Sequence, residues 1–376
     1  MPENKKRKHL KISNTASKIL LLFFLLSFGT VKNLSAQCPH TPKCPFEDCL
    51  NDGLSKATAY QIYTKAHLQE LSDSIMQTFS PVTINWTNGK HFRLMNDITD
   101  SVDFVIGGGS TNVGFYFAGY FYGGGHKITL AINPNSSLQR VALFGGVRRG
   151  GIDSLEVDGY VIKNYTSSNS QVAGIVAALY AFLPDYVFIT NSVNNATVTN
   201  NTRSYAVAGV VAFASNAIIF NCKNNNAVIG DADYLGGVSG INENTTISYS
   251  MNSSDLINIS NKIDGATGGI AGILHRASSI SNSLNLNVVK GYNRVGGIAG
   301  FMNLWNQSIS NCINYSFTKG TENVGGILGF MNNGGIVSNN FNSGVVEGAS
   351  NVGCIIGLEN GGTVENNHYD KQMCGE

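Results

Sequence analysis

Histidine is the residue of this chain that could hold a catalytic zinc ion. Zinc peptidases carry a His-Glu-x-x-His motif on a helix, which places two ligands one turn apart and a glutamate beside them as the base. His67 and Glu70 share a predicted helix, but no second histidine follows them. The motif is absent around all seven histidines, which are His9, His40, His67, His91, His126, His275 and His368. The sequence therefore predicts no peptidase chemistry, no bound metal and no cofactor.

Aspartates are a second group that could do chemistry, because clustered carboxylates can cleave glycosidic bonds or bind calcium. Asp231 and Asp233 could share one turn, and Asp97, Asp100 and Asp103 lie near the first predicted strands. Aspartate is also a common turn residue without any catalytic role. We therefore expect no catalytic residue in this chain. A polysaccharide-cleaving enzyme, with a site that the sequence does not reveal, is the alternative.

Aromatic residues between Phe115 and Tyr122 are the main candidates for ligand binding. Side chains alternate between the two faces of a strand, so a core face with Phe115, Phe117 and Phe121 leaves three tyrosines outward, Tyr116, Tyr120 and Tyr122. Tyrosine rings can stack on sugars while their hydroxyls form hydrogen bonds. The alternative is that a helix or the cysteine-rich segment covers them. Further exposed candidates are Trp305, in a predicted turn, and three residues of a long insertion, Tyr180, Phe182 and Tyr186.

Cysteines crowd near the N-terminus, among three prolines. Cys38, Cys44 and Cys49 are six and five residues apart, a spacing that matches no familiar zinc pattern. In an exported protein such a cluster favours a disulfide. Free or intermolecular thiols and a metal site are the alternatives.

The first 36 residues have the pattern of a signal peptide. Four basic residues at 5–8 and Lys18 precede the apolar stretch Ile19–Val31, which is too short to span a bilayer comfortably. Leu34 and Ala36 then suit cleavage before Gln37. An uncleaved membrane anchor and a lipid anchor at Cys38 are the alternatives. No later segment approaches 18 apolar residues, so we expect an exported chain without a transmembrane span, extracellular or at the bacterial cell surface or outer membrane.

Composition points to a structure rich in turns and backbone contacts. The 376 residues include 43 glycines but only 13% charged residues, and 25 basic residues balance 24 acidic ones. This balance excludes a strongly basic nucleic-acid-binding protein and a charge-extended disordered chain. Short apolar runs separated by glycine and asparagine favour an all-β protein over a helical one.

A repeat of about 28–30 residues runs through the second half of the chain. Each copy has a run such as Gly268–Gly272 (Gly-Gly-Ile-Ala-Gly) and, later, a β-branched residue before one or two asparagines. The β-branched anchors are 27 to 33 residues apart, at Ile189, Ile219, Ile247, Ile280, Ile309, Val337 and Val364. A unit this short cannot bury its apolar face alone, so stacked units of short strands are expected, which is a parallel β-solenoid.

Asparagines recur at fixed places in these units. One follows the anchor by two residues in most copies, and asparagine tolerates the left-handed backbone of a tight turn. A second series lies three residues further on and predicts an amide ladder along the stack, through Asn194, Asn224, Asn252, Asn285, Asn314 and Asn342.

An amphipathic helix is predicted from Thr64 to Phe79. Thr64 is a suitable N-cap, and one stripe carries Leu68, Leu71, Ile75, Met76 and Phe79. Such a helix would cover the open N-terminal end of the solenoid, where an unpaired strand edge would otherwise be exposed.

The repeats resemble those of GLUG-motif proteins, which are exported bacterial proteins. The resemblance is carried by the Gly-Gly-Ile-Ala-Gly runs, the asparagine-cysteine pairs after the anchors, the strand and turn at Phe117–Ile128, and the closing segment Asn367–Met373. It covers about Gly53 to Glu376 and implies a right-handed parallel β-helix of the pectate-lyase-like (pectin-lyase-like) type. It also implies a cell-surface, often adhesin-like, role. IgA-cleaving metallopeptidases share these repeats, so the motif indicates architecture more than activity.

Together these features predict four regions. They are a signal peptide at 1–36, a Cys/Pro-rich segment at 37–55, a capping helix with the first strands at 56–105, and the β-solenoid at 106–376. A rigid surface with repeated polar residues suits multivalent binding. We expect a non-catalytic, adhesin-like module that binds glycans or host or matrix proteins and no nucleic acid. The alternatives are the polysaccharide-cleaving enzyme and a structural spacer of a larger surface protein.

Overall fold

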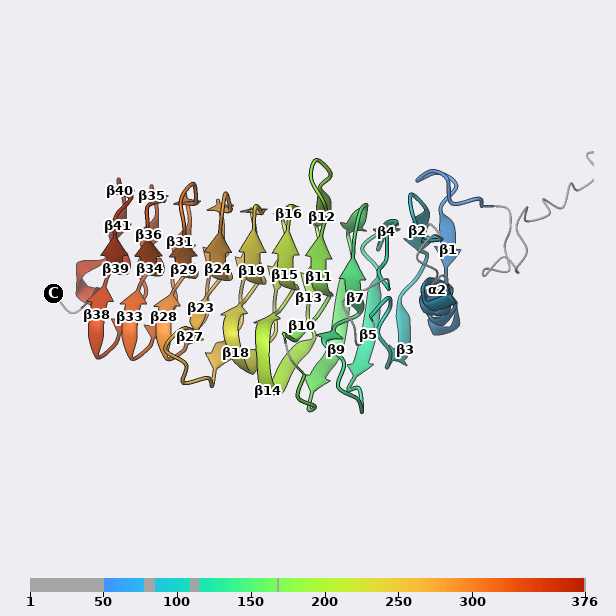
Figure 1. The fold of residues 1–376 in the computed structure, drawn as a ribbon, viewed down its shortest axis with the longest axis horizontal. Helices are drawn as coiled ribbons and strands as arrows, with labels where there is room; N and C mark the ends of the chain where they lie inside the picture. Colours follow the sequence, from blue (N-terminus) through green and yellow to red (C-terminus); the bar gives the residue numbers. More distant parts are fainter. Residues whose placement is uncertain (1–50, 78–84, 109–114, 168, 375–376) are drawn as a thin grey trace, which may run out of the picture. The chain divides into compact units, whose positions relative to one another are not determined.

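The computed structural model describes residues 51–77, 85–108, 115–167 and 169–374. The predicted signal peptide at 1–36 and the cysteine cluster Cys38, Cys44 and Cys49 lie outside these residues. Within them the chain is an all-β parallel solenoid, in which every strand pair of the three sheets runs parallel. Figure 1 shows the successive coils side by side, so that each strand lies next to its counterpart in the following coil.

Sheet A contains eleven strands, one from almost every coil, and it carries the repeat anchors. Its strands, in spatial order, are β1 (Tyr60–Ile62), β2 (His91–Leu94), β4 (Tyr120–Tyr122), β8 (Gly151–Asp153), β12 (Val187–Thr190), β16 (Ala217–Phe220), β20 (Thr246–Ser248), β25 (Ser279–Ser281), β30 (Ser308–Ser310), β35 (Ile336–Ser338) and β40 (Thr363–Glu365).

Sheet C contains eight strands, which carry the glycine-rich runs. They are β7 (Phe144–Val147), β11 (Val176–Tyr180), β15 (Val211–Ser215), β19 (Ser239–Glu243), β24 (Ala271–His275), β29 (Ala299–Asn303), β34 (Leu328–Asn332) and β39 (Ile356–Asn360).

Sheet B contains 22 strands, and its rows are joined by the long strands β9, β14 and β18. Along one row lie β3 (Ile98–Val102), β5 (Lys127–Ile132), β9 (Glu156–Lys163), β14 (Thr197–Ala208), β18 (Val228–Gly236), β22 (Leu256–Asn258), β27 (Val289–Lys290), β32 (Thr318–Lys319) and β37 (Val346–Glu347). A second row adds β6 (Arg140–Val141), β10 (Gln171–Ala173), β23 (Ala266–Gly268), β28 (Asn293–Gly296), β33 (Glu322–Gly325) and β38 (Ser350–Gly353). A third adds β13 (Val193–Asn194), β17 (Lys223–Asn224), β21 (Met251–Asn252), β26 (Leu284–Asn285), β31 (Ile313–Asn314), β36 (Phe341–Asn342) and β41 (His368–Tyr369).

The strand register confirms the repeat. The predicted anchors pair with one another from coil to coil in sheet A, from Ile189 with Ile219 to Val337 with Val364. All but the last are fully buried in one core that continues along the interior of the solenoid. Each apolar run is short, and its side chains are buried because they pack beside the equivalent side chains of the coils before and after it.

Both asparagine series have their predicted roles. In the first, the residues have positive φ angles near 50–60°, at Asn191, Asn221, Asn282, Asn311, Asn339 and Asn366. In the second, each buried side-chain amide donates to the Oδ1 of the next at 2.8–2.9 Å, from Asn194 through Asn224, Asn252, Asn285 and Asn314 to Asn342. The ladder satisfies polar groups that the short coils could not otherwise bury.

Helix α2 (Lys65–Gln77) lies beside the first strands (Figure 1). Leu68, Leu71 and Ile75 are fully buried in the main core, and the Thr64 hydroxyl accepts a hydrogen bond from the His67 amide at 3.3 Å. Met76 and Phe79 of the predicted stripe fall outside the described side chains. The helix therefore packs by its apolar stripe on the end of the stack that begins with β1, while its role as a cap stays a prediction.

Cysteines of the solenoid behave in two ways. Cys222 and Cys312 are free and buried, and burial raises the pKa of each thiol to about 12. They occupy equivalent positions three units apart, too far for a bridge. Cys354 and Cys374 form a disulfide, which attaches the short 3-10 helix η1 (Lys371–Cys374) to the last coil.

Candidate functional site

The outer face of sheet A carries an unusual set of side chains in its first coils. Side chains alternate along a strand, so two residues of each strand point outward on either side of the buried central one. Register places His91 beside Tyr120, and Arg93 beside Tyr122. Further along the same two rows lie Gly151, Phe188 and Ile218 in one, and Asp153, Thr190 and Phe220 in the other.

These outward residues and an adjoining turn residue include two groups of aromatic rings in contact. The His91 ring stacks on Tyr120 with centroids 4.6 Å apart and on Tyr122 at 5.8 Å, with interplanar angles of 16° and 11°. Tyr120 is 6.1 Å from Phe188, and Phe220 meets the turn residue Tyr249 at 5.5 Å. We name the set the aromatic strip; its members are His91, Tyr120, Tyr122, Phe188, Ile218, Phe220 and Tyr249.

The strip becomes more exposed along the solenoid. His91, Tyr120 and Tyr122 are half-buried, whereas Phe220 is 40% and Tyr249 58% exposed. From β20 onward the equivalent outward positions of sheet A carry mostly hydroxyl residues, at Thr246, Ser248, Ser279, Ser281, Ser308, Ser310, Ser338 and Thr363; the exceptions are Ile336, which is 46% exposed, and Glu365. We take this surface as the candidate site, because burying the core does not require exposed apolar side chains next to one another.

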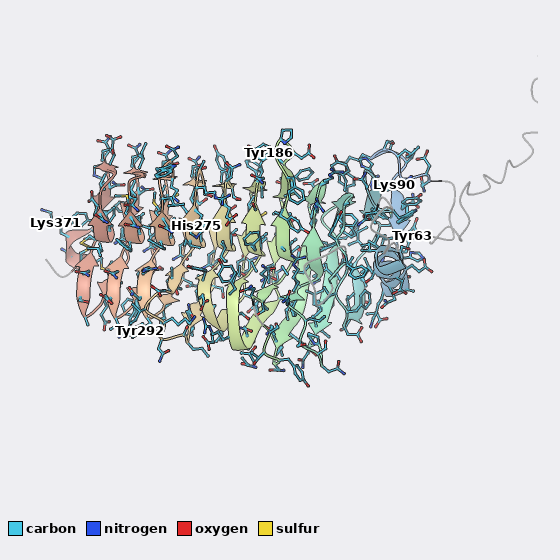
Figure 2. The ribbon with its side chains drawn as sticks, in the orientation of Figure 1. Tyr63, Lys90, Tyr186, His275, Tyr292 and Lys371 are labelled. Atoms are coloured by element: carbon cyan, nitrogen blue, oxygen red, sulfur yellow. A yellow bond between two sulfur atoms is a disulfide. The ribbon has the colours of Figure 1, made fainter. Side chains whose placement is uncertain are left out.

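The loop between β11 and β12 stands over this surface. It projects further than the corresponding loops of other coils (Figure 1), and Tyr186 lies near its tip (Figure 2). Phe182 and Tyr186, two of the predicted aromatic candidates, are 59% and 53% exposed. The third, Tyr180, belongs to sheet C.

Two hollows flank the first strands of the strip. The first, which we name the cationic hollow, has a volume of about 350 Å³ and lies where β2, β4 and β8 end, with Lys56, Arg93, Tyr122, His126 and Asp153 in its lining. The second, the loop hollow, has about 260 Å³ and lies where these strands begin, with Asn88, Tyr120, Arg149, Asp185 and Tyr186 in its lining. Strand β4 therefore joins two concave regions across sheet A.

Contacts in the cationic hollow are a cation–π contact and several hydrogen bonds. The Lys56 Nζ lies 4.6 Å from the centre of the Tyr122 ring, and the Arg93 Nη2 donates to the Lys56 carbonyl at 2.8 Å. The Asp153 Oδ1 accepts from the Thr190 hydroxyl and the Asn191 amide, both at 2.8 Å.

Burial shifts the pKa values of His91 and Tyr122 in opposite directions. Burial lowers the pKa of His91, so its ring is neutral at pH 7, and its Nδ1 lies 2.9 Å from the Tyr122 hydroxyl. Burial is also the main cause that raises the pKa of Tyr122, helped by Tyr120 and Asp153. The pair therefore presents neutral hydrogen-bonding groups rather than a charge.

The predicted outward row of three tyrosines is wrong as a single row. Tyr120 and Tyr122 lie together in β4, but Tyr116 belongs to another cluster, where Arg148 donates to its hydroxyl at 3.2 Å and stacks over Phe182 at 4.0 Å. Phe117 and Phe121 are buried as expected, and Phe115 is partly buried.

The cause is a corner of the solenoid between Tyr116 and Tyr120. Phe117 bridges Val147 of sheet C, whereas Tyr120 begins a strand of sheet A. At Gly119 the chains approach so closely that a Cβ would lie 2.4 Å from the Lys90 carbonyl oxygen. Alternation does not continue through such a corner, so sequence periodicity places Tyr116 incorrectly.

Trp305 is 67% exposed, as predicted, but it lies far along the chain from the strip, in the turn between β29 and β30. Sequence reasoning missed Phe188, Ile218, Phe220 and Tyr249. A signal was present, because Ala217–Phe220 has apolar residues on both sides of a buried anchor and Val187–Thr190 has one, Phe188, before its anchor.

Three of the five aspartates that could do chemistry have ionic partners in the structure. Asp233 lies 2.8 Å from Lys262 and 3.4 Å from Arg203, Asp103 lies 2.8 Å from Lys65, and Asp97 lies 3.2 Å from His126. Burial raises the pKa of Asp233, which lines a third hollow of about 390 Å³ near β14 and β18. Within the described ranges, no group of three or more histidine, cysteine, aspartate or glutamate residues could hold a metal ion.

Comparison with known proteins assigns neither a family nor a function to this chain. No family model matches the chain, and no curated protein matches it. Among solved structures, it is similar to a putative immunoglobulin A1 protease from Bacteroides ovatus, at 17% identity over 88% of this chain and 79% of that one, with a TM-score of 0.42. The assignment to the parallel β-solenoids therefore rests on the strand register described above. No helix in the part of the chain that the structure describes is long and apolar enough to cross a membrane.

Proposed function

We propose that this chain is an exported, non-catalytic binding module that holds glycans on the aromatic strip. The observation that carries the proposal is the set of neighbouring apolar and aromatic residues on the outer face of sheet A, where Ile218 and Phe220 of β16 and the turn residue Tyr249 are exposed and Phe188 of β12 is half-buried. A spacer would need no such surface, because β25 and β30 stack with serine in both outward positions.

Glycans fit this surface better than a flat protein partner. Sugar rings combine apolar faces with hydroxyl groups, and aromatic residues beside hydrogen-bonding groups suit both. The strip offers those groups at its edges, through the Tyr122 hydroxyl, Asn191 and the hydroxyl of Thr190. The partners found for Asp97, Asp103, Asp153 and Asp233 weaken the polysaccharide-cleaving alternative.

The test is a glycan and matrix-protein array with the chain purified after export. Phe220→Ser and Tyr249→Asn introduce the residues that neighbouring coils carry at the same positions, so each removes a ring and keeps the backbone. We expect each to weaken the strongest glycan signal about tenfold, or ~1.4 kcal/mol, without lowering the melting temperature.

Tyr315→Ser is the matched control, because Tyr315 is also an exposed aromatic residue and Ser343 occupies its position in the next coil. Equal losses in Tyr315→Ser and the strip variants would contradict the proposal. Trp305→Ala tests the predicted tryptophan separately. Release of sugar products from a bound polysaccharide would favour the enzyme, and an array without signal would favour the spacer.

A further inference from the structure

We propose that the cationic hollow selects saccharides that carry a carboxylate or a sulfate group. This inference rests on the proposed glycan binding and adds the chemical class of the ligand. Within the described residues, Lys56 and Arg93 have no ion-pair partner, although both line a concave surface. A pair of unpartnered cations in a hollow attracts an anion, since their charges are not already compensated.

The other ionisable groups of the hollow do not cancel this charge. Asp153 is its one lining carboxylate, and the Asp153 Oδ1 is held by Thr190 and Asn191. His126 pairs with Asp97 at 3.2 Å. Among the lysine, arginine and aspartate residues of the lining, Lys56 and Arg93 against Asp153 leave a charge of 2 − 1 = +1.

Arg93 has the geometry for the acidic group. Its Nη2 uses one hydrogen bond to the Lys56 carbonyl, at 2.8 Å, which fixes the side chain and leaves other guanidinium N–H groups to donate. A planar guanidinium can donate two parallel bonds to a carboxylate or sulfate. Lys56 adds a second charge on the same wall, where it now lies over the Tyr122 ring.

The adjoining strip defines where the sugar ring would lie. Lys56 lies over the Tyr122 ring, and the His91 ring is nearly parallel to that ring, with centroids 5.8 Å apart and the His91 Nδ1 2.9 Å from the Tyr122 hydroxyl. An acidic group at Arg93 would therefore leave its sugar ring along the edges of Tyr122 and Tyr120, which continue toward Phe188. The hollow provides selectivity, and the strip provides contact area.

The test uses the full chain, purified after export, with three hexasaccharides in isothermal titration calorimetry. Hexagalacturonate carries only carboxylates, a heparin-derived hexasaccharide adds sulfates, and cellohexaose is neutral. At low salt we expect at least one acidic hexasaccharide to bind about tenfold or more tightly than cellohexaose. The difference should shrink between about 0.1 M and 1 M salt, as the Debye length falls from about 10 Å to 3 Å.

Variants locate the effect. Arg93→Gln and Lys56→Gln should each weaken acidic binding about tenfold and leave cellohexaose binding unchanged, because they remove charge but no strip residue. Lys56 is exposed, so Lys56→Gln leaves folding intact even if Arg93→Gln disturbs it. Lys290→Gln removes an exposed lysine from β27, remote in sequence from the hollow, and should have no effect.

Each outcome decides the matter. Preference for hexagalacturonate or for the heparin fragment assigns the carboxylate or the sulfate as the group bound. Equal binding of acidic and neutral sugars, or an equal loss in Lys290→Gln, would overturn the selectivity and leave the proposed function standing. If none of the three hexasaccharides binds, the inference is wrong, and the wider array decides separately whether glycan binding fails with it.

Discussion

Asparagine solves two different problems in this solenoid, depending on its place in the coil. At the turns it adopts positive φ, as at Asn221, where its short polar side chain makes the left-handed backbone tolerable. Three residues later, Asn224 is buried and donates both to Asn252 and to the carbonyl of Asn226. Because a buried amide without partners is costly, each ladder member depends on its neighbours.

Adjacent asparagines allow this dependence to be measured. We expect Asn224→Ala to lower the free energy of unfolding by about 2–4 kcal/mol, because it leaves buried groups of Asn194 and Asn252 unpaired. Asn225 is exposed and bonds to Asn195 at 2.9 Å, so Asn225→Ala should change stability by about 0.5 kcal/mol or less. Chemical denaturation measures both. Similar values for the two variants would show that the ladder contributes no special stability.

Helix α2 is the element that differs from the repeating coils. It contributes Leu68, Leu71 and Ile75 to the core, and the Ser72 hydroxyl donates to the Val105 carbonyl at 3.2 Å. An ion pair of 2.8 Å between Lys65 and Asp103 adds a contact at its N-terminal end. These contacts tie the helix to the segment that follows β3.

A capping role predicts that the helix is part of the folded unit. Leu71→Ala should lower the free energy of unfolding by about 2–4 kcal/mol, because Leu71 is fully buried and its truncation leaves a cavity. Asp73→Ala, on the exposed side of the same helix, should change it by about 0.5 kcal/mol or less. A small effect from Leu71→Ala, measured by thermal and chemical unfolding, would mean that the helix does not support the stack.

At the scale of the whole solenoid, burial depends on having a coil on both sides. Val337 and Val364 are register partners in β35 and β40, with the same side chain in the same place of the repeat. Val337 is 0% exposed, whereas Val364 is 39% exposed. In a stacked repeat the stability of a coil comes largely from its interfaces with its neighbours. The same residue therefore contributes more to the free energy of unfolding in an inner coil than in the last one.

This valine pair gives a direct test of the stacking. Val337→Ala should lower the free energy of unfolding by about 2 kcal/mol, and Val364→Ala by less than about 1 kcal/mol. The reason is that hydrophobic stabilisation follows the apolar area removed from water. The midpoint of urea unfolding compares the two variants at once. Equal costs would contradict the view that neighbouring coils, rather than intrinsic strand preference, stabilise each unit.

Much of this architecture follows from the sequence by itself, because a repeat constrains every copy in the same way. The spacing of the anchors predicted their pairing in sheet A, and the second asparagine series predicted the ladder. The helix at 65–77 followed from its apolar stripe and the N-cap Thr64. The alternation of side chains along a strand and the length of the repeat predict strand pairing and buried positions wherever the backbone continues without a corner.

The candidate site was decided only by the tertiary structure. Tyr116 and Tyr120 are four residues apart but belong to different clusters because the chain turns at Gly119. Conversely, Lys56 meets Tyr122, and Phe220 meets Tyr249, across separations of 66 and 29 residues. Parallel stacking brings together residues of successive coils. The strand register decides which outward side chains become neighbours, and this register depends on the lengths of the loops. Sequence periodicity determined the inside of this protein, while the register and corners of the stack decided its surface.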